Sequence, residues 1–293
     1  MILYFILGVF PAFLLPIYGH HCGKLRESQL YNRKEITAPD EYTWIGRVGY
    51  VYGNRTEFSC FSVLIHRRYA IINAFCILDN LASFIVFGDW RENKDITVGD
   101  CLVEGITAQC SPPPQRVDIE ELVVHPGYNR LDDYNFGLAK LVENVIFSDF
   151  VQPLCLPPAG ETESNHIAQR LEMAGFRRPL RKGDTVDKEG EWRRKVQVHT
   201  ASMEFCRSLG GNNWPNRTQH HICALGKEEN TLYFGSPLMG IEVVDGKPRN
   251  FYLVGLPGSV ELLGHPSNLS MLLFTSIFPF RNWIVKNMEL DYN

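Results

Sequence analysis

The sequence contains eight cysteines, and this number constrains the fold more than any other feature of the chain. An even number of widely spaced cysteines is typical of a secreted protein whose fold is held together by disulfides. Four bridges are expected, although spacing alone allows on the order of 100 ways of pairing eight cysteines. No Cys-x-x-Cys pair occurs, so the spacing gives little support to a zinc ribbon. The cysteines are Cys22, Cys60, Cys76, Cys101, Cys110, Cys155, Cys206 and Cys223.

Residues 1–19 differ from the rest of the chain because they contain no charged side chain. Their apolar run is about as long as the core of a secretory signal, and Pro11 and Pro16 interrupt it. A transmembrane helix needs about 20 apolar residues in a row. We therefore interpret residues 1–19 as a signal peptide cleaved near Gly19, although the usual basic start is absent. An uncleaved anchor is the alternative, and no later segment is long and apolar enough to span a membrane.

Three Asn-x-Ser/Thr sequons are open to glycosylation in a secreted protein. They begin at Asn54, Asn216 and Asn268. Because a sequon is a short pattern that also occurs by chance, we expect only some of the three to be occupied.

The composition is that of an ordinary globular protein, with 45% hydrophobic and 21% charged residues. The 29 Lys and Arg against 33 Asp and Glu give a net charge of −4, which argues against a nucleic-acid-binding protein. One segment, residues 177–195, is densely basic. A solvated loop is the default interpretation, and a contact patch for an acidic partner is the alternative.

Short runs rich in Val, Ile and aromatic residues recur along the chain, separated by Gly, Asn and Arg, and they predict β-strands. Their regular spacing favours a sandwich or a pair of barrels. Residues 280–288 place Trp283, Ile284 and Met288 at helical spacing and predict a C-terminal helix. The predicted strands are residues 45–52, 58–65, 69–73, 82–87, 120–124, 136–141, 195–200 and 251–256.

Several blocks occur in an order that resembles the chymotrypsin-like serine proteases, and within them the secreted arthropod clip-domain group. The likeness covers roughly residues 37–288. The blocks are TAPDEYTW (37–44), FSVLIHRRYAIINAF between Cys60 and Cys76, GDW (88–90), PPPQ (112–115), HPGY (125–128), FSDFVQPLCLP (147–157), GSPLMG (235–240) and FTSIFPFRNWI (274–284). The first of them looks like the opening strand of that family.

The resemblance implies an all-β fold of two packed six-stranded antiparallel β-barrels, with a C-terminal helix and the site between the barrels. It divides the chain into the signal peptide, a linker at residues 20–36 and a trypsin-like domain at residues 37–293. Only Cys22 precedes Cys60, so no clip module with its own six cysteines is expected. The resemblance also selects the disulfides, which are Cys22–Cys155, Cys60–Cys76, Cys101–Cys110 and Cys206–Cys223.

The catalytic triad of this family is replaced at all three matching positions. Phe75 stands where the family has histidine, and a phenyl ring cannot act as a general base. Asn135 stands at the aspartate position and cannot stabilise an imidazolium as a carboxylate does. Phe234 stands at the serine position and has no nucleophilic atom. Asp132 and Asp133 lie close in sequence but out of register.

The groups that support the triad are replaced as well. Leu232 takes the place of the oxyanion-hole glycine, and Tyr233 that of the aspartate that receives the freed N-terminus after activation. The activation site itself matches Leu30 followed by residues 31–34, with neither a basic residue nor an isoleucine where the family needs them. Ser236 lies two residues beyond the nucleophile position, and we interpret it as a small residue in a tight turn.

Phe75 and Phe234 are expected to face each other across the cleft and to pack edge to face, with their rings within about 7 Å. The alternative is an open apolar slot that grips a side chain of a partner.

The remaining candidate residues give little indication of a metal, cofactor or substrate site. The adjacent pairs His20–His21 and His220–His221 point apart in extended chain, so no metal site is expected, and no cofactor is predicted. Glu228 lies near the lower wall of the specificity pocket of the family, where it is either a remnant or a solvated loop charge.

The sequence therefore predicts a secreted serine protease homologue without catalytic activity. By its resemblance it acts as an adaptor, cofactor or regulator in an extracellular proteolytic cascade, such as innate immunity and melanisation, and its partners are proteases, zymogens or recognition proteins. One alternative is an active trypsin-like endopeptidase, and another is a protein that binds glycans or microbial surfaces. A trypsin-like protease could still cut at Arg33 or Lys34 and leave the two pieces joined by a disulfide.

Overall fold

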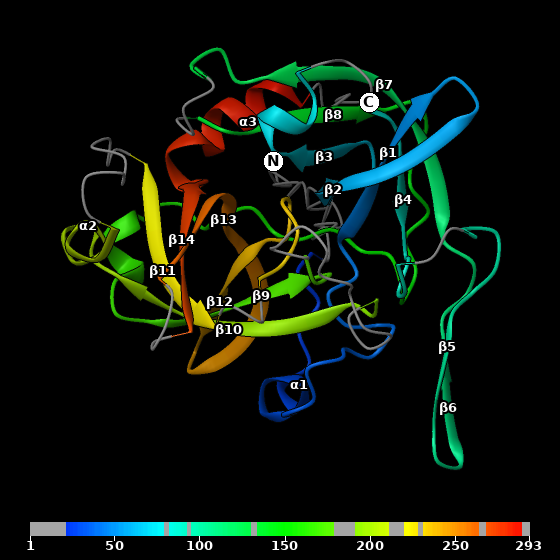
Figure 1. The fold of residues 1–293 in the computed structure, drawn as a ribbon, viewed down its shortest axis with the longest axis horizontal. Coiled ribbons are helices and arrows are strands. Elements are labelled where there is room, and N and C mark those ends of the chain that lie inside the picture. The colour runs from blue at the N-terminus through cyan, green and yellow to red at the C-terminus, as the bar shows by residue number, and fades with distance from the viewer. Residues whose placement is uncertain are drawn as a thin grey trace, which may run out of the picture.

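The computed structural model describes eight segments of the chain, and they form two barrels side by side (Figure 1). Several sequence predictions lie outside these segments: the signal peptide, His20, His21, Asp132, Asp133, Asn216 and Glu228. The described residues are 22–78, 82–92, 95–129, 134–178, 191–210, 220–227, 231–263 and 268–288.

The first barrel is closed by six antiparallel strands in the order β1-β2-β3-β8-β7-β4. β1 and β2 are joined by a two-residue turn, in which Gly53 adopts a φ of 60° that suits a tight hairpin. The strands are β1 (Ile45–Tyr52), β2 (Arg55–His66), β3 (Tyr69–Ile72), β4 (Ala82–Phe87), β7 (Gln115–Val124) and β8 (Gly137–Leu141).

The second barrel is also closed by six antiparallel strands, in the order β10-β11-β14-β13-β12-β9. Together with the first, it confirms the predicted fold class of two six-stranded barrels. The strands are β9 (Arg170–Gly175), β10 (Arg194–Ala201), β11 (His221–Lys227), β12 (Leu238–Val244), β13 (Lys247–Leu262) and β14 (Leu269–Ser276).

A two-stranded hairpin, β5 (Cys101–Glu104) with β6 (Thr107–Cys110), stands outside both barrels and projects from the first (Figure 1). The two cysteines lie opposite each other in the hairpin register and form a disulfide. The structure contains three further disulfides, Cys22–Cys155, Cys60–Cys76 and Cys206–Cys223. These four bridges join the pairs that the family resemblance implies.

Helices are few and short. α1 (Glu27–Tyr31) lies in the N-terminal segment, and α2 (Met203–Gly210) precedes β11. The predicted C-terminal helix is confirmed as α3 (Arg281–Asn287), which follows a single 3₁₀ turn, Phe278–Phe280. Ile284 of α3 is fully buried in the same core as the first barrel. None of the helices within the described residues is both long enough and apolar enough to cross a membrane.

The segment from Thr37 to Trp44 is not the strand that the sequence suggested. The N–H of Glu41 donates to the carbonyl of Ala38, which makes a turn, and Tyr42 has a φ of 53° that no extended strand allows. The segment is nevertheless largely buried, with Tyr42 and Trp44 both in the core.

The basic stretch at residues 177–195 is not a solvated loop where the structure describes it. Arg193, Arg194 and Lys195 are all buried, while residues 179–190 lie outside the described segments. Arg193 donates hydrogen bonds to the carbonyls of Ala38 (3.3 Å) and Pro39 (2.7 Å). These contacts offset the cost of burying a guanidinium, which composition alone could not anticipate.

Candidate functional site

The candidate site lies where the loop that follows β3 in the first barrel meets the loop between β11 and β12 in the second. Phe75 belongs to a 3₁₀ turn, Ala74–Cys76, which the Cys60–Cys76 disulfide anchors to β2. Just before this turn, the fully buried Asn73 donates through Nδ2 to the carbonyl of Pro257 (2.9 Å) on β13. The turn that presents Phe75 is therefore fixed to both barrels.

Asn135 lies next to this turn, two residues before β8. Its Oδ1 accepts a hydrogen bond from the backbone N–H of Phe75 (3.3 Å), and its side chain is fully buried. Its Nδ2 has no hydrogen-bond partner among the described residues. The carboxamide therefore braces the Phe75 turn and does not orient an imidazole.

Phe234 completes the cluster from the second barrel. Its ring lies 4.7 Å from that of Phe75, centroid to centroid, at an interplanar angle of 83°. The predicted edge-to-face contact is thereby confirmed, and no open slot separates these two rings. The carbonyl of Phe234 also accepts a hydrogen bond from the N–H of Phe61 on β2 (2.9 Å), which fixes its loop to the first barrel.

The residues around Phe234 form a tight, buried loop. Leu232 is buried in the core of the second barrel. The ring of Tyr233 lies 5.5 Å from that of Phe61, and burial raises the pKa of the Tyr233 hydroxyl. Gly235 has a φ of 93°, and a Cβ there would lie 1.9 Å from the carbonyl oxygen of Phe61, so no other residue fits.

Ser236 does not face the cleft residues as a nucleophile would. It is fully buried, its N–H donates to the carbonyl of Tyr233 (3.2 Å), and its Oγ has no hydrogen-bond partner among the described residues. A Cβ on Gly175 would lie 2.0 Å from that Oγ. Ser236 therefore occupies a tight turn against β9.

One contact was not anticipated from the sequence. The guanidinium of Arg178 lies 4.3 Å from the centroid of the Phe234 ring, which is the geometry of a cation–π contact. Burial lowers the pKa of Arg178. The only indication of this contact in the sequence was that Arg178 belongs to the basic stretch at residues 177–195, and that stretch does not predict which aromatic ring Arg178 contacts.

The three side chains at this site limit the kinds of reaction in which they can take part. Phenyl rings hold no proton-accepting atom, and a carboxamide does not titrate in the range of pH that proteins survive. Phe75, Asn135 and Phe234 can offer apolar contact surface and amide hydrogen bonds, but they cannot pass a proton between them.

No metal site emerges from the part of the chain that the structure describes. Within it, no three or more His, Cys, Asp and Glu side chains are grouped so that they could hold a metal ion. His220 packs against the ring of Phe280 at 5.2 Å, and its neighbour His221 is buried in β11. The side chains of the two histidines therefore lie in different surroundings.

A sequence profile described as Trypsin matches residues 37–284. The CLIP domain-containing serine protease HP8 of Bombyx mori is 27% identical over 286 residues, which cover 92% of this chain and 72% of that protein. Phenoloxidase-activating factor 3 of Holotrichia diomphalia is 26% identical over 266 residues, or 87% of this chain and 72% of that protein.

A solved structure with a similar fold is the crystal structure of the Drosophila Grass clip serine protease of the Toll pathway. It superposes with a TM-score of 0.73 at 21% identity and covers 93% of this chain and 76% of that chain.

Proposed function

The chain belongs to the trypsin family of serine proteases, and from this premise we propose that it is a secreted homologue without catalytic activity. In this proposal it acts as an adaptor, cofactor or regulator in an extracellular proteolytic cascade. Its relatives include proteins named phenoloxidase-activating factor 1 and melanization protease 1, which is why innate immunity and melanisation are the proposed setting. Its partners would be proteases, zymogens or recognition proteins.

The observation that carries the proposal is the edge-to-face pair of Phe75 and Phe234 with Asn135 beside it. Acyl transfer by this family needs a nucleophilic hydroxyl, an imidazole that takes its proton and a carboxylate that orients the imidazole. Two phenyl rings in edge-to-face contact stand at the positions that the family pattern gives to the imidazole and the hydroxyl.

The oxyanion-hole position also supports the absence of catalytic activity. A protease that lacks its triad keeps some rate through the oxyanion hole and substrate binding. Here Leu232 stands at the oxyanion glycine position. Leucine keeps the backbone N–H but lacks the conformational freedom with which glycine aims it, and an oxyanion donor that is not aimed at the substrate costs about 100–1,000-fold in rate. The residual rate expected of this chain is therefore very low.

Three features support secretion. The apolar leader precedes the barrels in sequence, and the four disulfides require an oxidising compartment. Two of the three sequons, at Asn54 and Asn268, are exposed on the surface, where a glycan can be attached.

Labelling tests the absence of catalysis. The protein, secreted from insect cells, is incubated with a serine-directed fluorophosphonate and with fluorogenic peptides, and bovine trypsin is the positive control. We expect no covalent adduct and no hydrolysis above buffer. Turnover that disappears in Ser236→Ala would show that the chain is an endopeptidase and would overturn the proposal.

Capture from insect haemolymph tests the adaptor role. The immobilised protein is incubated with haemolymph, and the retained proteins are then labelled with the same fluorophosphonate after a zymogen-activating step. Recovery of labelled proteases supports the adaptor role. Binding to washed bacteria, with no labelled protease retained, would instead favour a glycan or microbial-surface binding protein.

A further inference from the structure

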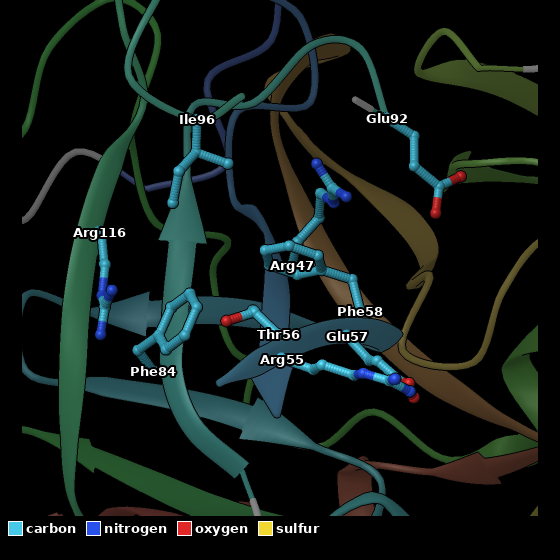
Figure 2. Close-up of a pocket in the computed structure, with 9 residues that line it drawn as sticks. All are labelled: Arg47, Arg55, Thr56, Glu57, Phe58, Phe84, Glu92, Ile96 and Arg116. Carbon is cyan, nitrogen blue, oxygen red and sulfur yellow. The ribbon is translucent and has the colours of Figure 1, made fainter. Parts of the chain in front are cut away.

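A pocket of about 750 Å³ opens on the first barrel, away from the aromatic cluster of the candidate site. None of Phe75, Asn135 and Phe234 is among its lining residues. The pocket lies between the β1–β2 hairpin, β4, β7 and the segment after β4 (Figure 2). Its volume falls in the range of binding pockets and exceeds that of a single side chain, so several residues of an extended polypeptide fit. The lining residues are Arg47, Arg55, Thr56, Glu57, Phe58, Phe84, Glu92, Ile96 and Arg116.

One wall of the pocket consists of two guanidinium groups that stack on two phenyl rings. The guanidinium of Arg47 lies 4.1 Å from the centroid of Phe58, and that of Arg116 lies 3.9 Å from the centroid of Phe84. The two rings meet edge to face at 5.9 Å. Such stacked contacts restrict all four side chains, so this wall is formed before any ligand arrives.

Two of the three arginines in the pocket already have a carboxylate partner. Arg47 forms a buried ion pair with Asp89. Arg116 forms an ion pair with Asp118 at 3.2 Å. Within the described residues, no hydrogen bond or ion pair engages the side chains of the other three charged residues, Arg55, Glu57 and Glu92. Among the described residues, these three carry one more negative charge than positive charge.

Glu92 has no side-chain hydrogen bond or ion pair among the described residues, although the charge of Arg47 acts on it. Its backbone N–H is fixed to the carbonyl of Glu191 (2.7 Å), and its half-buried side chain lines the pocket (Figure 2). Burial raises the pKa of Glu92, the nearby positive charge of Arg47 opposes this rise, and Asp89 and Glu191 add to it. A positive charge placed beside this carboxylate gains more than one placed beside an exposed carboxylate, because less water screens the contact.

Glu57 lies beside Arg55 at the rim on the hairpin, and the half-buried ring of Phe58 lies between this rim and Arg47 (Figure 2). The aliphatic Ile96 lines the same pocket. An apolar stem that ends in a cation fits this arrangement, since the stem can cover Phe58 and Ile96 while the head reaches Glu92.

We propose that this pocket binds an extended segment of a partner protein through a lysine or arginine side chain that pairs with Glu92. This inference rests on the proposed function, because it names the kind of partner surface that an adaptor of this family would hold. The pocket test does not depend on catalysis, however, so the two proposals can fail separately.

A phage-displayed library of random heptapeptides tests the pocket. The probe protein is the full chain secreted from insect cells, and the variants are Glu92→Gln, Arg55→Gln and the matched control Glu143→Gln. Glu143 is exposed and is not among the residues that line the pocket. Near-ultraviolet circular dichroism and melting temperature establish that each variant is folded.

The expected result is enrichment of peptides that contain lysine or arginine. The best of them is synthesised with a fluorophore, and its dissociation constant is measured by fluorescence polarisation. Glu92→Gln should weaken binding about tenfold, the size of one charge-assisted hydrogen bond. Replacing the basic residue of the peptide by norleucine should weaken binding to the same extent, while Glu143→Gln should leave it unchanged.

Three results would overturn the proposal. The first is enrichment of acidic peptides whose binding is lost in Arg55→Gln, which would make the pocket an anion site. The second is binding of basic peptides that Glu92→Gln does not weaken, and the third is no enrichment at all. If haemolymph proteases are still captured in the third case, the adaptor role survives and uses another surface.

Discussion

The phenyl rings of Phe75 and Phe234 meet edge to face at 4.7 Å, and they come from different barrels. The contact therefore does two things. It joins two positions that the sequence pattern predicts for reacting groups of the family, and it adds an aromatic pair to the interface between the barrels.

The ring pair is expected to stabilise the fold. Phe75→Ala and Phe234→Ala should each lower the free energy of unfolding by about 1–3 kcal/mol, since both rings are half-buried. A double-mutant cycle measured by urea unfolding should give a coupling of about 0.5–1.5 kcal/mol. Single-variant effects that simply add would mean that the rings touch without stabilising each other.

Arg193 should be among the most costly side chains to remove. It is fully buried, and besides its bonds to Ala38 and Pro39 it donates to Thr37 Oγ1 (3.3 Å). Arg193→Met leaves these acceptors unpaired and should lower the free energy of unfolding by about 3–5 kcal/mol. The exposed Arg249 provides the control, and Arg249→Met should change it by less than about 0.5 kcal/mol. Equal effects of the two substitutions in urea unfolding would contradict this account.

Much of the first barrel could be predicted because its strands carry clear local signals. β1 begins and ends at the predicted residues, since a run rich in Val, Ile and Tyr is followed by the Gly53–Asn54 turn. The second barrel was predicted less completely. β14 combines Leu, Met and Ser, which give only a weak preference for a strand, and its pairing with β11 and β13 in the closed barrel is a tertiary feature that local sequence does not show.

The same limit applies to the site. The positions of Phe75, Asn135 and Phe234 came from the family pattern, and that pattern brings them together in space. The burial of Arg193 could not be predicted, because its acceptors at residues 37–39 lie far away in the sequence. The contact of Arg178 with Phe234 could not be predicted either, because a run of basic residues does not indicate which aromatic ring a guanidinium will contact.

Stability should fall in mild acid because of His125. Its ring stacks on Tyr134 at 4.9 Å and lies 4.8 Å from the ring of Trp283, and burial lowers its pKa. Since the pKa of His125 in the folded state lies below the unfolded value of about 6.5, the stabilisation is complete above the unfolded pKa. It is lost as the pH falls from there through the lower pKa of the folded state. Melting temperatures between pH 7.5 and 5 should show this loss.

The matched control for this pH effect is the exposed His199. His125→Gln should lower the melting temperature at pH 7.5 and flatten its dependence on pH, whereas His199→Gln should keep the parental slope. A parental slope in His125→Gln would assign the acid sensitivity to other groups.

Glycans are expected on Asn54 and Asn268. Asn54 lies at the exposed tip of the β1–β2 hairpin, and Asn268 is exposed just before β14. The protein secreted from insect cells should lose mass on treatment with peptide N-glycosidase F, and Asn54→Gln and Asn268→Gln should each remove one glycan from the intact mass. An unchanged mass in either variant would show that its sequon is not used.

Cleavage by a trypsin-like protease should cut the N-terminal segment without releasing it. Arg33 and Lys34 are exposed in the short stretch between α1 and the barrels, whereas the chain is buried again from Thr37, so a trypsin-like protease can reach these two residues. The Cys22–Cys155 disulfide ties the segment on the other side of the cut to the body. Brief treatment with trypsin should therefore add the mass of one water to the intact protein, and the N-terminal peptide should separate only after reduction.

In the double variant Cys22→Ser with Cys155→Ser, the same cut should release the peptide without reductant. Release from the parent protein before reduction would mean that this bridge does not hold the segment in solution.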